Sequence, residues 1–118
     1  MGFCVNRNNI TVTRFDYGVS LVWNAKDSEG NPVDITGCEV QVIIKRNTYC
    51  PDSSAILNET IFAEGTSVEI SITKELTSNP VGTYYYALRL MENGTFVDTL
   101  IQAQFIISQN TFSEGANV

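Results

Sequence analysis

Alternation of apolar and polar side chains is the feature that most constrains what this chain can fold into. It is cleanest in SVEISIT, residues 67–73, where Val68, Ile70 and Ile72 alternate with polar neighbours. Because successive side chains of a strand point to opposite faces of a sheet, a spacing of two predicts a strand with one face buried. Similar patterns predict further strands at residues 10–14, 17–25, 38–46, 56–62, 83–91 and 95–108.

Turn-forming residues separate these segments. Residues 26–32, KDSEGNP, form a cluster of turn formers. Asn93-Gly94 predicts a type I′ hairpin turn, which needs positive φ at both central residues. Thr73 is expected to cap a single helical turn over residues 73–78. About seven strands with regular turn signals favour an antiparallel immunoglobulin-like β-sandwich, with a small closed barrel as the alternative.

The 118 residues suit one domain, with its core over about residues 9–108 and a frayed tail at 109–118. In such a sandwich we expect strands 38–46, 83–91 and 95–108 to lie in one sheet. Their alternation then assigns an inward set: Cys38, Val40, Val42, Ile44, Tyr84, Tyr86, Leu88, Leu90, Val97, Ile101, Ala103, Phe105 and Ile107. In the strand at 17–25 we expect one face to carry Tyr17, Val19, Leu21, Trp23 and Ala25.

The opposite face of the same sheet is rich in apolar side chains. It is assigned Ile43, Tyr85, Ala87, Met91, Phe96, Leu100 and Ile106, interspersed with Gln41, Arg89, Gln102 and Gln104. A mixture of aromatic, methionine and arginine side chains is typical of protein interfaces. We therefore predict a protein-docking face formed by Ile43, Tyr85, Ala87, Arg89, Met91, Phe96 and Leu100, unless loops, the N-terminal segment or the tail cover it. Strand addition by a partner along residues 95–108, taken as an edge strand, is a variant of this prediction.

The composition argues against catalysis. The chain has no histidine, so the Ser-His and Cys-His arrangements of nucleophilic enzymes are excluded. The carboxylate pairs Asp27/Glu29, Asp34/Glu39 and Glu59/Glu64 fall in turns or on solvent-facing positions. We predict no catalytic residues, no cofactor and no metal site.

Calcium is the nearest metal alternative, at residues 27–34, DSEGNPVD. Gly30 is not at the sixth position that an EF-hand loop requires, so the pattern favours a polar hairpin turn.

Charge and cysteine content narrow the partners. Thirteen acidic against seven basic residues give a net charge of −6, and the basic residues are scattered, which argues against nucleic acid. No apolar run is long enough for a membrane span, and no signal-peptide pattern opens the sequence, although a removed leader stays open. Cys4, Cys38 and Cys50 are expected to be reduced thiols, with Cys38 buried; a Cys4–Cys50 disulfide is the alternative.

Several motifs occur in a familiar order. They are Arg14 and Asp16; then Gly30, Pro32, Asp34, Ile35, Thr36 and Gly37; then Gly82, Thr83, Tyr84 and Tyr85. Over residues 9–108 this order resembles the N-terminal immunoglobulin-like domain of phage baseplate upper proteins, with Phe15 in place of a glycine. The resemblance implies a non-catalytic virion component that is assembled in the host cytoplasm and docks to other tail proteins or to itself.

A second class of function stays open beside this one. An immunoglobulin-like adhesion or carbohydrate-binding domain of a bacterial surface protein would present aromatic rings to solvent beside polar groups. Tyr49, Tyr85 and Phe96 are the candidates for such rings. Tyr84 and Tyr86 are expected inside instead, with Tyr84 acting as a tyrosine corner that returns its hydroxyl to nearby backbone.

Overall fold

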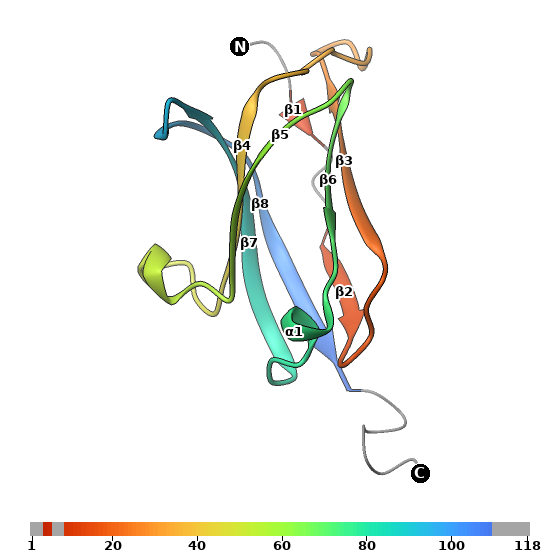
Figure 1. Ribbon diagram of the computed structural model, residues 1–118, viewed down its shortest axis with the longest axis vertical. Helices are drawn as coiled ribbons and strands as arrows, with labels where there is room; N and C mark the ends of the chain where they lie inside the picture. The colour runs from red at the N-terminus through yellow and green to blue at the C-terminus, as the bar shows by residue number, and fades with distance from the viewer. Residues whose placement is uncertain (1–3, 6–8, 110–118) are drawn as a thin grey trace.

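The computed structural model describes residues 4–5 and 9–109 (Figure 1). The strands are β1 (Cys4–Val5), β2 (Ile10–Thr13), β3 (Ser20–Lys26), β4 (Glu39–Lys45), β5 (Leu57–Phe62), β6 (Ser67–Ser71), β7 (Gly82–Glu92) and β8 (Thr95–Ser108). One 3-10 turn, η1 (Asp52–Ser54), and one helical turn, α1 (Lys74–Thr77), complete the described elements. The predicted β class is confirmed. The tail predicted to fray lies almost entirely outside the described residues.

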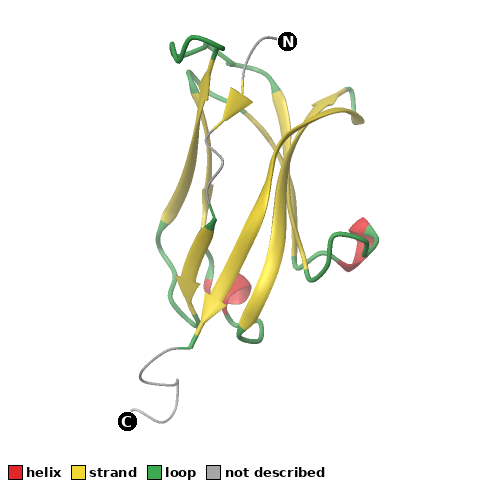
Figure 2. Cartoon of the chain, turned by 180° about the vertical axis from the view of Figure 1, so that it is seen from behind, coloured by secondary structure: helices red, strands yellow, loops and turns green. Residues whose placement is uncertain are grey.

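The strands form two unequal sheets (Figure 2). The larger has the order β2-β8-β7-β4-β5, and the smaller has the order β1-β3-β6. The larger sheet curls like half a barrel, and it is mixed because β2 runs parallel to β8 whereas its other pairs are antiparallel. The expectation of purely antiparallel sheets is therefore wrong at β2.

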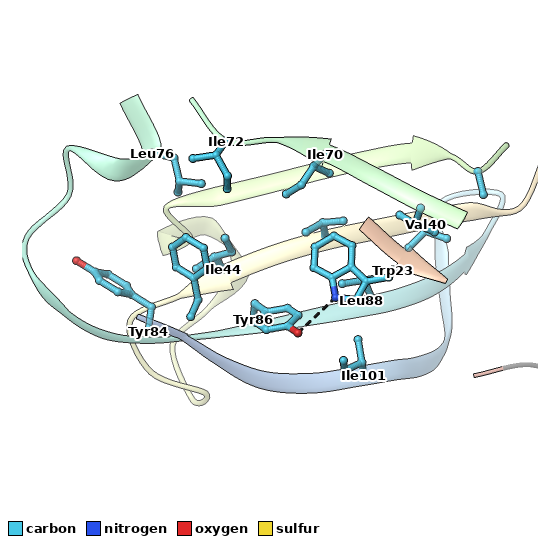
Figure 3. Packing of buried hydrophobic residues seen from close by; sticks show 14 of the residues in the cluster. Trp23, Val40, Ile44, Ile70, Ile72, Leu76, Tyr84, Tyr86, Leu88 and Ile101 are labelled. Carbon is cyan, nitrogen blue, oxygen red and sulfur yellow. Dashed lines mark hydrogen bonds between the residues drawn. The ribbon is translucent and has the colours of Figure 1, made fainter. Parts of the chain in front are cut away.

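One hydrophobic core lies between the sheets (Figure 3). The small sheet contributes Trp23, Ala25, Val68 and Ile70, and the large sheet contributes most of the predicted inward set. Trp23 and Tyr86 meet at the centre with ring centroids 5.7 Å apart. Tyr84 and Tyr86 are buried whereas Tyr85 is only partly so, which confirms the predicted phase of β7. Cys38 and Ala103 are partly buried against the core.

Hydrogen bonds and backbone dihedral angles confirm three predictions about turns. The Thr73 hydroxyl accepts from the Leu76 amide at 3.1 Å and caps α1. Asn93 and Gly94 have φ values of 52° and 80°, as a type I′ turn requires. The Tyr84 hydroxyl donates to the Pro80 carbonyl at 2.7 Å, which forms the predicted tyrosine corner.

Strict alternation fails in β8. The pairing of β7 with β8 is irregular between Leu88 and Arg89 and again between Leu90 and Met91. An extra residue in one strand shifts the phase of the residues beyond it. Val97, predicted inside, is consequently 50% exposed, and Leu100, predicted on the outer face, packs partly against the core.

The N-terminal part of the strand predicted at residues 17–25 is not a strand in the structure. The strand β3 begins only at Ser20, so Tyr17 and Val19 are exposed rather than inside. They belong to a loop in which Phe15 has a φ of 74°. That is the left-handed region that glycine favours and that other residues seldom adopt. The Phe15 amide donates to the Thr77 carbonyl at 3.2 Å, which holds this loop against the end of α1.

The tyrosine corner can be tested by removing one oxygen atom. We expect Tyr84→Phe to lower the free energy of unfolding by about 1 kcal/mol, because the Pro80 carbonyl loses its donor while the ring stays packed. Tyr49→Phe is the matched control, since Tyr49 is the most exposed of the large apolar side chains. Urea unfolding measures both, and equal effects would contradict the assignment.

Candidate functional site

The outer face of the five-stranded sheet is the surface on which the sequence placed a docking site. The register of β4 with β7 sets Gln41 opposite Arg89, Ile43 opposite Ala87, and Lys45 opposite Tyr85. These six side chains alternate with those of the core between the sheets and therefore project from the opposite face. The structure thus brings Ile43, Tyr85, Ala87 and Arg89 together as predicted.

The loop between β4 and β5 folds back over this face. Lys45 Nζ donates to the Cys50 carbonyl at 2.6 Å and lies 3.1 Å from Asp52 Oδ1. Arg89 Nη1 lies 2.8 Å from Asp52 Oδ2. Asp52 therefore joins the loop to two cations on neighbouring strands. The Arg89 and Lys45 side chains, which donate hydrogen bonds to its carboxylate, lower the pKa of Asp52.

This loop corrects part of the predicted docking face. Ile43 is 1% exposed and Ala87 is 8% exposed, so neither is available to a partner. The ion pair that holds this loop joins Asp52 to Arg89, 37 residues away in the sequence. The alternation of residues within β4 and β7 therefore could not predict it. Leu100 is lost from the face for the different reason given above, the irregular pairing of β8.

A row of three apolar residues and one glutamate lies at the hairpin end of the same face. The register places Phe62, Glu39, Met91 and Phe96 side by side across β5, β4, β7 and β8. We call these four residues the Phe62–Phe96 row; at a strand spacing of about 4.8 Å it is about 14 Å long. Phe62 is 68% exposed, Phe96 is 53% exposed and Met91 is partly buried. The Arg89 guanidinium lies 6.0 Å from the Phe96 ring centroid.

Sequence reasoning missed Phe62. The segment at 56–62 has weak alternation, so its phase could not be assigned from the pattern alone. The pairing of Phe62 with Glu39 fixes the phase and places the ring outside. A groove of about 310 Å³ adjoins the row and is lined in part by Phe62, Glu39 and Met91.

Tyr85 lies in a different hollow on the other side of the folded loop. This groove of about 530 Å³ is lined by Asn9, Thr48, Tyr85, Gln102, Ala103 and Gln104. None of these described lining residues carries a charge. Asn9 Oδ1 accepts from the Gln104 amide at 3.0 Å, which holds the segment before β2 against β8.

The other predicted features have structural roles. Asp27 Oδ1 accepts from the Glu29 and Asn31 amides, both at 2.9 Å, and Asp34 Oδ1 accepts from the Thr36 amide and hydroxyl. These bonds lower the pKa of both carboxyls, that of Asp27 chiefly through Asn31. They make a polar turn of the 27–34 segment. Within residues 4–5 and 9–109 no group of three or more acidic, cysteine or histidine side chains is placed to hold a metal.

The remaining predictions concern the cysteines and the pairing of β8. Cys38 and Cys50 are free thiols, while the Cys4 side chain lies outside the described part of the chain. The prediction that β8 is an edge strand is wrong over Phe105–Ser108, which pair with β2.

The Asp52 contacts make stability depend on pH. A carboxyl whose pKa is lowered by folding stabilises the native state fully above its unfolded-state pKa of about 3.9, and the stabilisation is lost as pH falls through the folded-state value. We expect Asp52→Asn to cost about 1 kcal/mol or less at pH 7, because the carboxylate is half exposed, and to cost progressively less below about pH 4. Urea unfolding across this pH range measures the difference.

The control for this prediction is a double-mutant cycle. In an Arg89→Gln background Asp52→Asn should cost less, since the nearer cation is gone. Additive effects of the two substitutions would contradict the proposed coupling.

No protein-family model and no curated protein matches this sequence. Among the described residues, no helix is long and apolar enough to cross a membrane.

Proposed function

We propose that this chain is a non-catalytic structural module that docks to other proteins through the Phe62–Phe96 row. The single observation that carries the proposal is that two exposed phenylalanines and a methionine lie in one row across the sheet, with Glu39 between Phe62 and Met91. Aromatic and methionine side chains are enriched at the centres of interfaces, and arginine, here Arg89, accompanies them. Partners are other subunits of an assembly or a second copy of the chain.

We further propose that the two sheets are an immunoglobulin-like arrangement. The order β8-β7-β4-β5 corresponds to the G-F-C-C′ sheet of variable-type domains, and β1-β3-β6 corresponds to A-B-E. The tyrosine corner at Tyr84 and the central Trp23 support this interpretation, although Trp23 lies on the second strand of the small sheet rather than on strand C.

The motif order supports a virion component of the phage tail or baseplate as the setting. The motif residues stand where they fix turns: Gly30 and Gly37 both have a φ of 86°, and Tyr84 forms the corner. Phe15 keeps the glycine-like conformation at the one position that departs from the pattern. These residues maintain a fold, which is consistent with a module that assembles rather than catalyses.

The test is loss of assembly without loss of folding. We expect the Phe62→Lys/Phe96→Lys double variant to weaken co-purification with products of neighbouring genes, or self-association in sedimentation velocity, by about thirtyfold, the effect of losing about 2 kcal/mol at an interface. Val22→Lys is the matched control, an exposed apolar residue on the small sheet. A chain that neither self-associates nor binds these products, or equal effects in both variants, would overturn the proposal.

Carbohydrate binding by a bacterial surface protein is the second candidate, and the Tyr85 groove is the observation that favours it. A single aromatic ring beside two glutamines and a threonine offers a stacking surface with neutral hydrogen-bonding groups. This chemistry suits an uncharged sugar better than an anionic one.

A glycan array separates this candidate from the first. If it is correct, the wild-type chain binds neutral saccharides and Tyr85→Ala reduces that binding at least about tenfold, because the groove loses its ring. Tyr49→Ala, which removes an exposed ring outside the groove lining, should leave binding unchanged. An array with no saccharide signal would reject the candidate.

A further inference from the structure

The strand β6 has a free edge within the described structure. Apart from a single bridge between its first residue, Ser67, and Glu64 of the preceding turn, it pairs with β3 on one side only. No other described strand lies on its second side. In Figure 1 β5 and β6 splay apart from the turn that joins them, and they do not pair with each other. A fourth strand, called D, occupies this place in immunoglobulin-like sandwiches with an A-B-E-D sheet.

The hydrogen-bond pattern identifies which amides face the opening. The Ala25 amide donates to the Thr66 carbonyl at 2.8 Å, and the Ile72 amide donates to the Val19 carbonyl at 2.7 Å. Backbone groups of successive residues point to opposite sides of a strand and those of alternate residues to the same side, so Val68 and Ile70 also face β3. The backbone groups of Glu69 and Ser71 therefore face the open side, where they can bond an incoming strand.

A groove lies along the same edge. It has a volume of about 460 Å³ and is lined by Ile61, Phe62, Ala63, Glu64, Ser67, Glu69 and Ser71. The end of β5 and the turn after it supply the apolar part, and the serines and two carboxylates supply the polar part. Among the residues that the structure describes, no basic side chain lines it. A backbone edge and a groove with alternating chemistry are the two elements that strand addition uses.

We propose that an extended basic segment of another protein binds in this groove and adds to β6 as a fourth strand of the small sheet. The Glu69 side chain projects from the outer face, so segment residues on that face are lysine or arginine. Alternate residues turn inward toward Ile61 and Ala63 and are apolar. Five residues of β6 set the length of the paired segment at about five to seven residues.

Charge decides against a second copy as the occupant. The groove carries Glu64 and Glu69, and the whole chain has a net charge of −6. Pairing β6 with β6 of a second copy would bring like carboxylates together, which is destabilising across a sheet. The site is separate from the Phe62–Phe96 row except for Phe62 at its rim, so the two proposals can fail independently.

The test uses the intact chain and a synthetic peptide, acetyl-KVKVKVK-amide, followed by backbone amide NMR. We expect saturable shifts centred on Glu69 and Ser71, slowed hydrogen exchange of these two amides, and a Kd at or below about 1 mM. Acetyl-EVEVEVE-amide tests the charge, and a KVKVKVK peptide N-methylated at alternate residues tests the backbone pairing. Both should bind at least about tenfold more weakly.

Variants of the chain complete the experiment. Glu69→Lys should weaken KVKVKVK binding at least about tenfold, and its own amide spectrum reports whether it is folded. Phe96→Lys, which alters only the docking row, should bind the peptide like the wild type. Absence of saturable shifts, shifts centred away from β6, or equal binding of the EVEVEVE or N-methylated peptide would overturn the proposal.

Discussion

The hydrogen bond from Trp23 Nε1 to the Tyr86 hydroxyl, 3.3 Å long and buried, joins the two sheets at the centre of the core. An indole N–H and a phenol hydroxyl would be costly to bury without partners, so this pair allows two large aromatic rings to fill the space between the sheets. It also fixes the phase of β7. With Tyr86 inside, Tyr84 is inside at the corner and Tyr85 must face out. Because paired residues of neighbouring strands lie on the same face of a sheet, this also determines which residues of β4 and β8 face the core.

The strands and most of the core could be predicted because alternation is a local signal. Every predicted strand is present, and Val40, Tyr86 and Phe105 lie where their spacing placed them. The errors have causes that spacing does not encode. The exposure of Val97 and Leu100 depends on the irregular pairing of β8 with β7. The burial of Ile43 depends on the loop that Asp52 holds against the sheet. The parallel pairing of β2 with β8 joins segments more than 90 residues apart, so local alternation could not predict it either.

The predicted face brings Ile43, Tyr85, Ala87 and Arg89 together, but the sequence did not predict which parts of it are exposed. The expected face is divided by the loop that Asp52 holds down, so that an apolar row remains at one end and a neutral polar groove at the other. Exposed apolar area is costly to keep on a soluble surface, and covering Ile43 and Ala87 reduces it to the part that stands free at the hairpin end. One sheet thus presents two chemically different surfaces, with Arg89 near the boundary through its contacts with both Asp52 and Phe96.

The parallel pair of β2 and β8 has a mechanical consequence. Residue 9 leads into β2 and residue 109 follows β8, so a force that separates these two points pulls the paired strands in opposite directions along their length. All the hydrogen bonds between Ile10–Thr13 and Phe105–Ser108 then bear the load together rather than opening one after another. The bond from the Arg14 amide to the Ser108 carbonyl, 2.9 Å long, extends the loaded segment. A domain tethered by both ends would resist stretching at this junction.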